Sequence, residues 1–206
     1  MKVEVCPQCG APAGASAKSC AYCKAEFVIT SISYLGQFDT AGVNKYLNYY
    51  KGMVKAAPED GPSQFALGLC YLKLRLFDLA VKQFGRAVEL TPEQPDAYYY
   101  YGLALIRGRR PKTMSLTEVR QIEEHVNSAM QLDGAKAKYN YLAAILKYDY
   151  YVANGLRVPE PSAEELLAQA LTKEHEQDEV ERLLDAVVLR DEGLVSAIRH
   201  ARSTAE

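Results

Sequence analysis

The chain has 206 residues, of which 49% are hydrophobic and 24% charged, and its formal net charge is −2. This length allows one sizeable helical domain plus a small lobe, and the near-neutral charge gives no reason on its own to expect a nucleic-acid-binding protein. No apolar run approaches the length of a membrane span, and paired cysteines without a secretory leader predict a reducing, cytoplasmic location.

The N-terminal segment, residues 1–30, contains two Cys-x-x-Cys pairs, Cys6 with Cys9 and Cys20 with Cys23. Four thiolates that meet at tetrahedral geometry bind Zn²⁺ tightly, and each pair can direct both sulfurs to one side of a tight turn. Gly10 can take a left-handed conformation that lets amide N–H groups approach the sulfurs. The spacing therefore predicts a metal site with Cys6, Cys9, Cys20 and Cys23 as ligands.

This segment resembles the zinc-ribbon family, whose knuckles commonly read Cys-Pro-x-Cys-Gly. The second knuckle departs from that pattern, with Ala21 after its first cysteine and Lys24 after its last. Because four thiolates fill the coordination sphere, the resemblance implies a structural Zn²⁺ with no position for an activated water. Ligand type alone leaves iron in a rubredoxin-like site open. A disulfide framework and a thioredoxin-like redox pair are disfavoured, since neither a secretory leader nor a βαβ context is present.

The lobe has few large apolar residues, and chains below about 40 residues usually need a metal or disulfides to fold. Structural zinc, which contributes on the order of 10–16 kcal/mol, would supply that stability. Short strands are predicted over residues 3–5 and 27–29, separated by the small-residue segment 11–17.

Beyond the ribbon the sequence repeats itself with a period of 34 residues. The shift places Gly68 on Gly102, Leu69 on Leu103 and the Pro-Glu pair at 58–59 on that at 92–93. A period of 34 built from two helices is the signature of tetratricopeptide (TPR) repeats, and residues 61–94 resemble a complete member of that family. The pattern predicts that small Gly68 and Ala80 allow two antiparallel helices to cross closely.

Later units follow with departures from the family pattern. The second repeat begins at Pro95 and carries an insertion at 107–115 before a helix over 116–132. A third begins near Lys136, and after a loop over 154–161 Ser162 and Glu165 form a capping box for its second helix. Residues 38–56 resemble the second helix of an incomplete repeat, and residues 183–189 are predicted to lie in a terminal helix that would cover the end of the stack.

These observations predict a mainly α protein, a TPR-like α-solenoid of helix pairs with a small N-terminal β zinc ribbon. The predicted division is a four-cysteine zinc ribbon over residues 1–30, a linker over 31–37 and a TPR-like helical repeat domain over 38–206. A generic helical bundle with coincidental self-similarity is the competing interpretation.

No catalytic constellation is present, and an enzyme is not expected. His125, His175 and His200 are isolated from any nucleophile or metal partner, and there is no Gly-rich phosphate loop, HExxH or GxSxG motif.

The TPR resemblance implies a concave groove, lined by the first helix of each pair, that holds a peptide or an amphipathic helix. An apolar, aromatic groove with basic side chains along one edge suits apolar side chains and carboxylates of a partner protein. The alternative is that N- or C-terminal helices of the same chain fill this face from within. The groove residues that the resemblance implies are Phe65, Leu69, Leu72, Lys73, Tyr99, Leu103, Ile106, Arg107, Lys147 and Tyr148, with Asn140 and Ala144 in the third unit.

The preferred function is thus a non-enzymatic protein–protein interaction adaptor or scaffold with a structural zinc ribbon. The alternative is a nucleic-acid-binding zinc-ribbon protein, which would need several cations on one continuous face. No sequence feature points specifically to self-assembly. The sequence identifies neither the partner nor the oligomeric state. The possible nucleic-acid contacts are Lys18 and Lys24 on the ribbon and Arg109, Arg110 and Lys112 in the basic loop.

Overall fold

The computed structural model describes residues 5–14, 17–175, 178–190 and 192–203. The chain divides into two compact units, Met1–Pro92 and Glu93–Glu206, and each is described by itself. Among the described residues, no helix is both long enough and apolar enough to cross a membrane.

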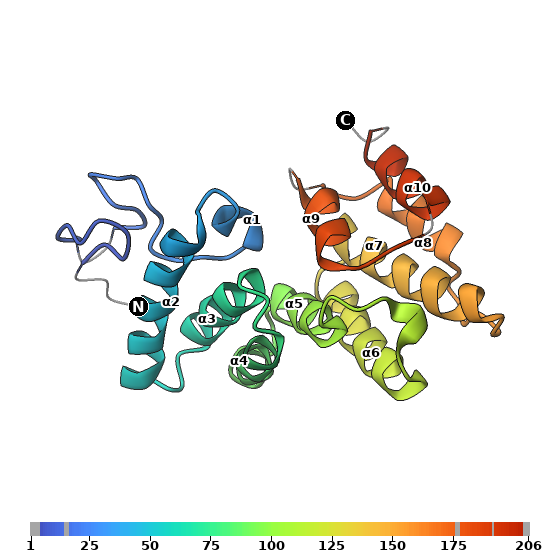
Figure 1. Ribbon diagram of the computed structural model, residues 1–206, viewed down its shortest axis with the longest axis horizontal. Coiled ribbons are helices and arrows are strands. Elements are labelled where there is room, and N and C mark those ends of the chain that lie inside the picture. The colour runs from blue at the N-terminus through green and yellow to red at the C-terminus, as the bar shows by residue number, and fades with distance from the viewer. Residues whose placement is uncertain (1–4, 15–16, 176–177, 191, 204–206) are drawn as a thin grey trace. The chain divides into compact units, whose positions relative to one another are not determined.

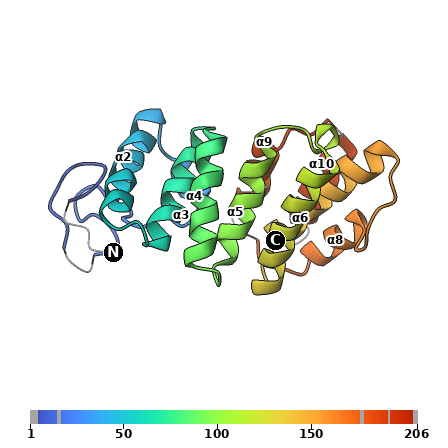
Figure 2. The ribbon, with the colours of Figure 1, turned by 90° about the horizontal axis from the view of Figure 1, so that it is seen from below.

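The first unit contains the cysteine loops and the helices α1 (Ile32–Leu35), α2 (Thr40–Ala56), α3 (Gly61–Lys73) and α4 (Phe77–Leu90). The cysteine loops lie beside α2, and α2, α3 and α4 follow one another side by side (Figures 1 and 2). The side chain of Asp39 caps α2 by accepting a hydrogen bond from the N–H of Gly42 at 2.8 Å. The segment predicted as a linker, 31–37, contains α1, whose Leu35 is fully buried.

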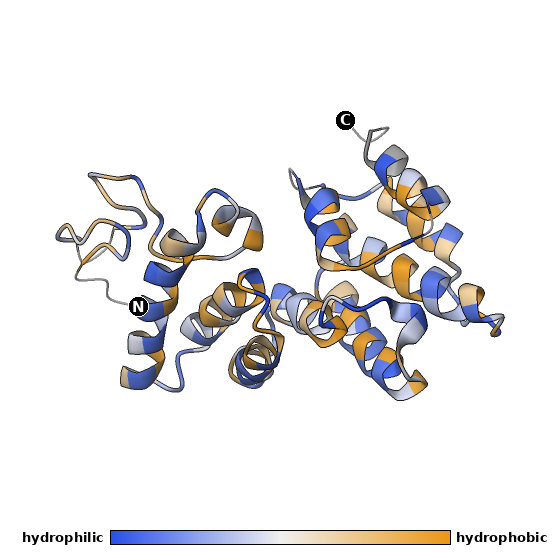
Figure 3. Ribbon diagram, viewed as in Figure 1, coloured by the Kyte–Doolittle hydropathy of each residue, from blue (hydrophilic) through white to orange (hydrophobic). Residues whose placement is uncertain are grey.

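The second unit contains α5 (Pro95–Ile106), α6 (Leu116–Leu132), α7 (Ala137–Leu146), α8 (Ala163–Ala170), α9 (Glu179–Ala186) and α10 (Glu192–Ser203). Helices α5 and α6 form one pair and α7 and α8 another, while α9 packs on α7 and α10 on α8. Figure 3 shows that α6 carries both hydrophobic and hydrophilic residues along its length, as expected for a helix with one face in a core. The predicted capping box of Ser162 and Glu165 is present at the start of α8.

Short irregular elements connect these helices. The insertion at 107–115 contains a 3₁₀ turn, η1 (Pro111–Thr113), and α7 continues into a π-helix, η2 (Lys147–Tyr151), and a 3₁₀ turn, η3 (Val152–Asn154). The predicted strands are reduced to the isolated bridges Val5–Pro12 and Ser19–Glu26. Val3 lies outside the described residues, and residues 27–29 form no strand.

Helices α3 and α4 cross as closely as the sequence predicts. A Cβ atom added to Gly68 would lie 2.7 Å from Cε1 of Phe84, and both Phe84 and Ala80 are fully buried. A contact below about 3 Å cannot be accommodated without moving the ring, because protein cores are close-packed.

We therefore expect Gly68→Ala to lower the free energy of unfolding by about 1–3 kcal/mol through overpacking. The matched control is Gly52→Ala on the exposed side of α2, where an added Cβ would meet no atom within 4 Å. That variant is expected to gain about 0.5–1 kcal/mol from helix propensity. Chemical denaturation monitored by circular dichroism measures both, and equal stabilities would contradict the close crossing.

Candidate metal centre

The four cysteine sulfurs predicted from the sequence come together in the structure. All four Sγ atoms lie within 4.8 Å of one another, with Cys6 and Cys23 at 3.5 Å and Cys9 and Cys20 at 3.6 Å. No disulfide joins them. Cys6 and Cys20 are buried, whereas Cys9 and Cys23 lie at the surface.

The two knuckles have the same backbone geometry, related by a shift of fourteen residues. In the first, the N–H of Cys6 donates to Ala11 O at 2.8 Å and the N–H of Gly10 donates to Cys6 O at 2.9 Å. In the second, the N–H of Cys20 donates to Ala25 O at 2.8 Å and the N–H of Lys24 donates to Cys20 O at 3.0 Å.

The residue after each knuckle is left-handed, as predicted for Gly10, with φ of 73° at Gly10 and 62° at Lys24. Lys24 thus takes a conformation that favours glycine, and its Nζ donates to Ala21 O at 3.0 Å. The departure of the second knuckle from the Cys-Pro-x-Cys-Gly pattern therefore leaves its turn geometry intact.

The arrangement fits a tetrahedral metal ion. A Zn–S bond of about 2.3 Å places the sulfurs of a regular tetrahedron about 3.8 Å apart. The sulfur pairs at 3.5 and 3.6 Å are close to that separation. The N–H of Gln8 also points at Cys6 Sγ from 3.4 Å, a contact of the kind that orients a metal ligand. The four cysteines can therefore bind a metal ion.

Two of the thiols have pKa values shifted in opposite directions. The backbone N–H of Cys23 lowers the pKa of Cys20 to about 6. Although the N–H of Ala25 lowers the pKa of Cys23, desolvation and the neighbouring sulfurs raise it to about 12. A bound cation would stabilise all four sulfurs as thiolates, including Cys23, whose thiol otherwise stays protonated.

Hydroxyl groups of three tyrosines, one on α1 and two on α2, hold the ribbon on these helices. Tyr50 OH donates to Phe27 O at 2.8 Å and accepts from the N–H of Ile29 at 3.1 Å. Tyr46 OH donates to Glu26 O at 2.8 Å, and Tyr34 OH accepts from the N–H of Glu26 at 2.7 Å. Both Tyr46 and Tyr50 are fully buried. These hydrogen bonds satisfy the backbone just after the second knuckle.

The first knuckle contacts the same helix. The side-chain amide of Gln8 donates to Gly42 O at 2.9 Å, and Lys45 Nζ donates to Gln8 O at 2.9 Å. The small core of the ribbon, formed by Cys6, Cys20, Ala25 and Phe27, packs against Tyr49 of α2. The four-cysteine cluster and the first helices are therefore parts of one packed unit.

We expect Tyr50→Phe to lower the free energy of unfolding of the metal-loaded protein by about 1–3 kcal/mol. The change leaves Phe27 O and the Ile29 N–H buried without their partner, and an unsatisfied buried group costs about that much. The control is Tyr22→Phe, because Tyr22 is 74% exposed. Denaturant titration measures both variants, and equal midpoints would contradict the role of Tyr50 in docking.

The structure buries the six apolar residues that the sequence assigns to a peptide groove. Phe65, Leu69 and Leu72 of α3 lie in the core of the first unit, where α1 packs on α3. In the second unit Tyr99, Leu103, Ile106, Asn140 and Ala144 are likewise buried. These side chains offer almost no surface to a ligand, which favours the alternative that the chain's own segments cover this face.

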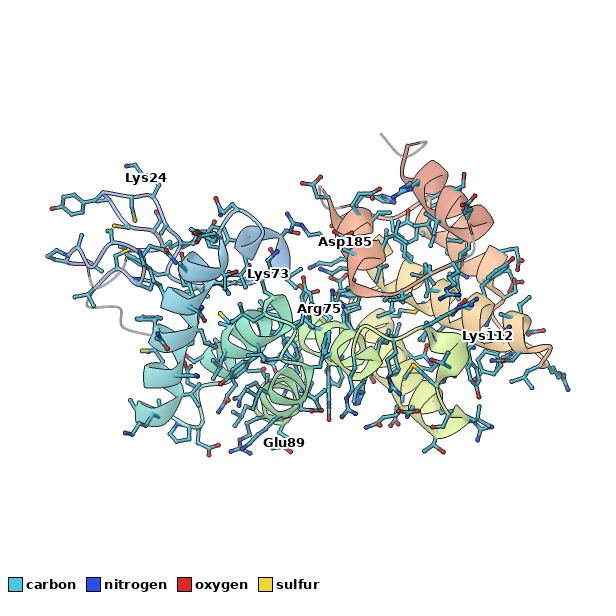
Figure 4. The ribbon with its side chains drawn as sticks, viewed as in Figure 1. Lys24, Lys73, Arg75, Glu89, Lys112 and Asp185 are labelled. Atoms are coloured by element: carbon cyan, nitrogen blue, oxygen red, sulfur yellow. The ribbon has the colours of Figure 1, made fainter. Side chains whose placement is uncertain are left out.

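The four other predicted groove residues retain more exposure. Arg107 is exposed, and Lys73, shown on α3 in Figure 4, and Tyr148 are half-buried. Lys147 is also partly accessible, but its Nζ lies 3.0 Å from Glu123 Oε1. The peptide-binding role of all these residues remains a prediction.

The arginines of the basic loop are engaged in ion pairs within the second unit. Arg109 lies 2.6 Å from Glu118, and this guanidinium holds the pKa of Glu118 down to about 2. Arg110 binds Asp149 through Nη2 at 2.7 Å and Nε at 2.9 Å, and the N–H of Lys112 donates to the same carboxylate at 3.1 Å. Arg109 and Arg110, two of the five predicted nucleic-acid contacts, therefore form ion pairs with carboxylates of the same chain.

The three lysines predicted for the same role are exposed. Lys24 lies on the ribbon and Lys112 on the segment before α6, as labelled in Figure 4. Lys18 is the third.

The two histidines whose side chains the structure describes, His125 and His175, each contact a tyrosine. His125 stacks on Tyr101 with ring centroids 4.3 Å apart, and His175 Nε2 is hydrogen-bonded to Tyr141 OH at 2.7 Å. The side chain of His200 lies outside the described part of the chain.

Two buried charged residues that organise the second unit were not predicted from the sequence. Asp149 is 1% exposed and anchors the basic loop, and Lys138 is 1% exposed and pairs with Asp96 at 2.9 Å. Their burial could have been predicted, because each is a charged residue within an apolar, tyrosine-rich run, and such a run must be buried.

The helix pairs and the four-cysteine loops define the fold class. The chain is mainly α, with TPR-like helix pairs and a small N-terminal ribbon, and this predicted fold class is confirmed.

Comparison with known proteins supports the fold alone. No protein-family model and no curated protein sequence matches the chain. The structure is similar to the crystal structure of MamA, a TPR-like protein, with a TM-score of 0.54 and 17% identity over 86% of this chain and 94% of that one. A second MamA structure has 20% identity over 74% of this chain and 71% of that one, with a TM-score of 0.46.

Proposed function

We propose that the chain is a non-enzymatic protein-interaction scaffold whose N-terminal ribbon holds one structural Zn²⁺ ion. The observation that carries the proposal is the combination of TPR-like helix pairs with a cluster of four cysteines. TPR-like folds present helix surfaces to extended peptides or helices of partner proteins. With cysteine in all four ligand positions, the metal has no open position for chemistry.

The zinc ion would act by fixing the ribbon on α2. The ribbon's apolar core is small, so metal ligation would hold its two knuckles together while Tyr34, Tyr46 and Tyr50 bind the segment that follows. Free thiolate ligands suit a reducing compartment, which makes the cytoplasm the proposed location. Metal analysis of the purified protein tests this part: one zinc per chain supports it, and iron with a thiolate-to-iron absorption band contradicts it.

A protein partner is favoured over nucleic acid by the ion pairs of the basic loop. Arg109 and Arg110 are held by Glu118 and Asp149, so phosphate binding would have to break those pairs. The exposed ribbon lysines, Lys18 and Lys24, supply little charge for binding that depends on phosphate neutralisation.

Affinity capture of the full chain from a native lysate, with and without nuclease, tests the proposed function. A discrete protein captured in stoichiometric amount after nuclease treatment supports the scaffold. Capture that collapses on nuclease treatment contradicts it. A bait with Lys18, Lys24 and Lys112 changed to glutamine is the matched control, because it should capture the same protein but lose any nucleic acid bound through these side chains.

A further inference from the structure

The π-helix η2 directs its side chains to two different neighbours. Asp149 faces the basic loop and binds Arg110, whereas Lys147 and Tyr151 face α6 and bind Glu123 at 3.0 and 2.8 Å. Single π-helical turns are rare in α-helices and occur frequently at functional sites. As a result, α6 has beside it a segment with charged and aromatic side chains, Lys147 and Tyr151.

A pocket of about 570 Å³ lies between α6, η2 and the segment that follows η2. The segment is fixed by hydrogen bonds. Asn154 Nδ2 donates to Lys112 O at 3.2 Å and to Tyr150 O at 2.8 Å, and the N–H of Leu156 donates to Tyr151 O at 2.9 Å. The walls are therefore held in place before any ligand arrives, which lowers the cost of binding.

The charges that line the pocket leave an excess of cations. Glu123 is matched by Lys147 and also accepts a hydrogen bond from Tyr151, so its charge is already compensated. Two further cations line the pocket, Arg120 from α6 and Arg157 from the segment after η3, and neither forms an ion pair with a described residue. Glu160 at the edge opposes them with one negative charge.

Apolar surface lies beside these two guanidinium groups. Leu116 is 40% exposed and Leu156 is 45% exposed, and both line the same pocket. Exposed leucines next to arginines suit a ligand that combines a carboxylate with an apolar side chain. The guanidinium group matches the geometry of a carboxylate, and the leucines would make no favourable contact with a free phosphate. The volume is within the range of about 300–1,000 Å³ that is typical of ligand pockets.

We infer that this pocket binds a short acidic–apolar segment of a partner protein, with a carboxylate at Arg120 and Arg157 and an apolar side chain against Leu116 and Leu156. The inference rests on the proposed function and adds to it a surface and a chemistry. The surface belongs to the second helix of a pair and to the segment after α7, and Lys147 is the residue that it shares with the groove predicted from the sequence.

A labelled octapeptide of alternating Asp and Leu, titrated with the full metal-loaded chain and read by fluorescence anisotropy, tests this inference. Saturable binding that weakens with added salt is expected, with at least about tenfold loss in Arg120→Gln and in Arg157→Gln, because each removes charge-assisted hydrogen bonds. Both arginines are exposed, so these variants should keep the helical circular dichroism of the parent.

Two controls make the result specific. Lys82→Gln, which removes an exposed charge from α4 in the first unit, should leave binding unchanged. A peptide with Asn in place of Asp should bind at least about tenfold more weakly. Equal binding of the two peptides, unchanged binding in both arginine variants, or no binding of the acidic peptide would overturn the inference. Protein capture from a lysate would still stand in those cases, which separates failure of this pocket from failure of the scaffold function.

Discussion

Replacing Cys20 by serine is expected to abolish stoichiometric metal binding and to release the ribbon from α2. Cys20 is buried, its Sγ lies 3.6 Å from Cys9 Sγ, and its backbone closes the second knuckle. A structural zinc site contributes on the order of 10–16 kcal/mol, and most of that free energy would be lost with one of four thiolates. The remaining core of the ribbon is too small to fold alone.

The control for this change is Cys70→Ala. Cys70 is fully buried in α3, and burial raises the pKa of its thiol to about 12, so it is a neutral packing group. The alanine variant should keep one metal ion per chain. Native mass spectrometry and metal analysis give the stoichiometry of both variants, and full metal occupancy in the Cys20→Ser protein would refute the four-cysteine centre.

The second large effect is expected at Asp149, which holds the basic loop. Asp149→Asn keeps the shape of the side chain but leaves the Arg110 guanidinium, 24% exposed, without its counter-charge. Removing one partner of a buried ion pair typically costs about 3–5 kcal/mol. We therefore expect a loss of stability of this size in the second unit, measured as a shift of its transition in chemical denaturation.

A surface ion pair is the matched control for Asp149. Arg86 and Glu59 lie 2.6 Å apart, but Glu59 is 73% exposed, and Glu59→Gln should change stability by less than about 1 kcal/mol. If the two substitutions shift stability by the same small amount, Asp149 does not organise the loop.

Features that depend on local sequence could be predicted. The period of 34 residues located the helix pairs, and the insertion before residue 116 and the capping box at Ser162 were both found. The cysteine spacing was sufficient to predict a sulfur cluster, since two tight turns constrain each pair almost independently of the rest of the chain.

Features that depend on distant contacts could not be predicted. Arg110 meets Asp149 across 39 residues, and Tyr50 meets Phe27 across 23, and no local pattern specifies either pairing. Leucine, as at the predicted groove positions 69 and 103, is typical both of an apolar groove and of a buried core. Only the packing of the surrounding elements shows that they are buried. The division into residues 1–30, 31–37 and 38–206 remains a prediction.

The most direct test of the central claim, that a metal-bound ribbon and the first helices form one unit, is amide hydrogen exchange of the full chain with and without its metal. Removing the metal should speed exchange at Cys20–Ile29 and also in the part of α2 that contains Tyr46 and Tyr50, while α5 to α8 stay unchanged. Exchange that is identical in the two states, or that changes only in the cysteine loops and not in α2, would contradict the claim.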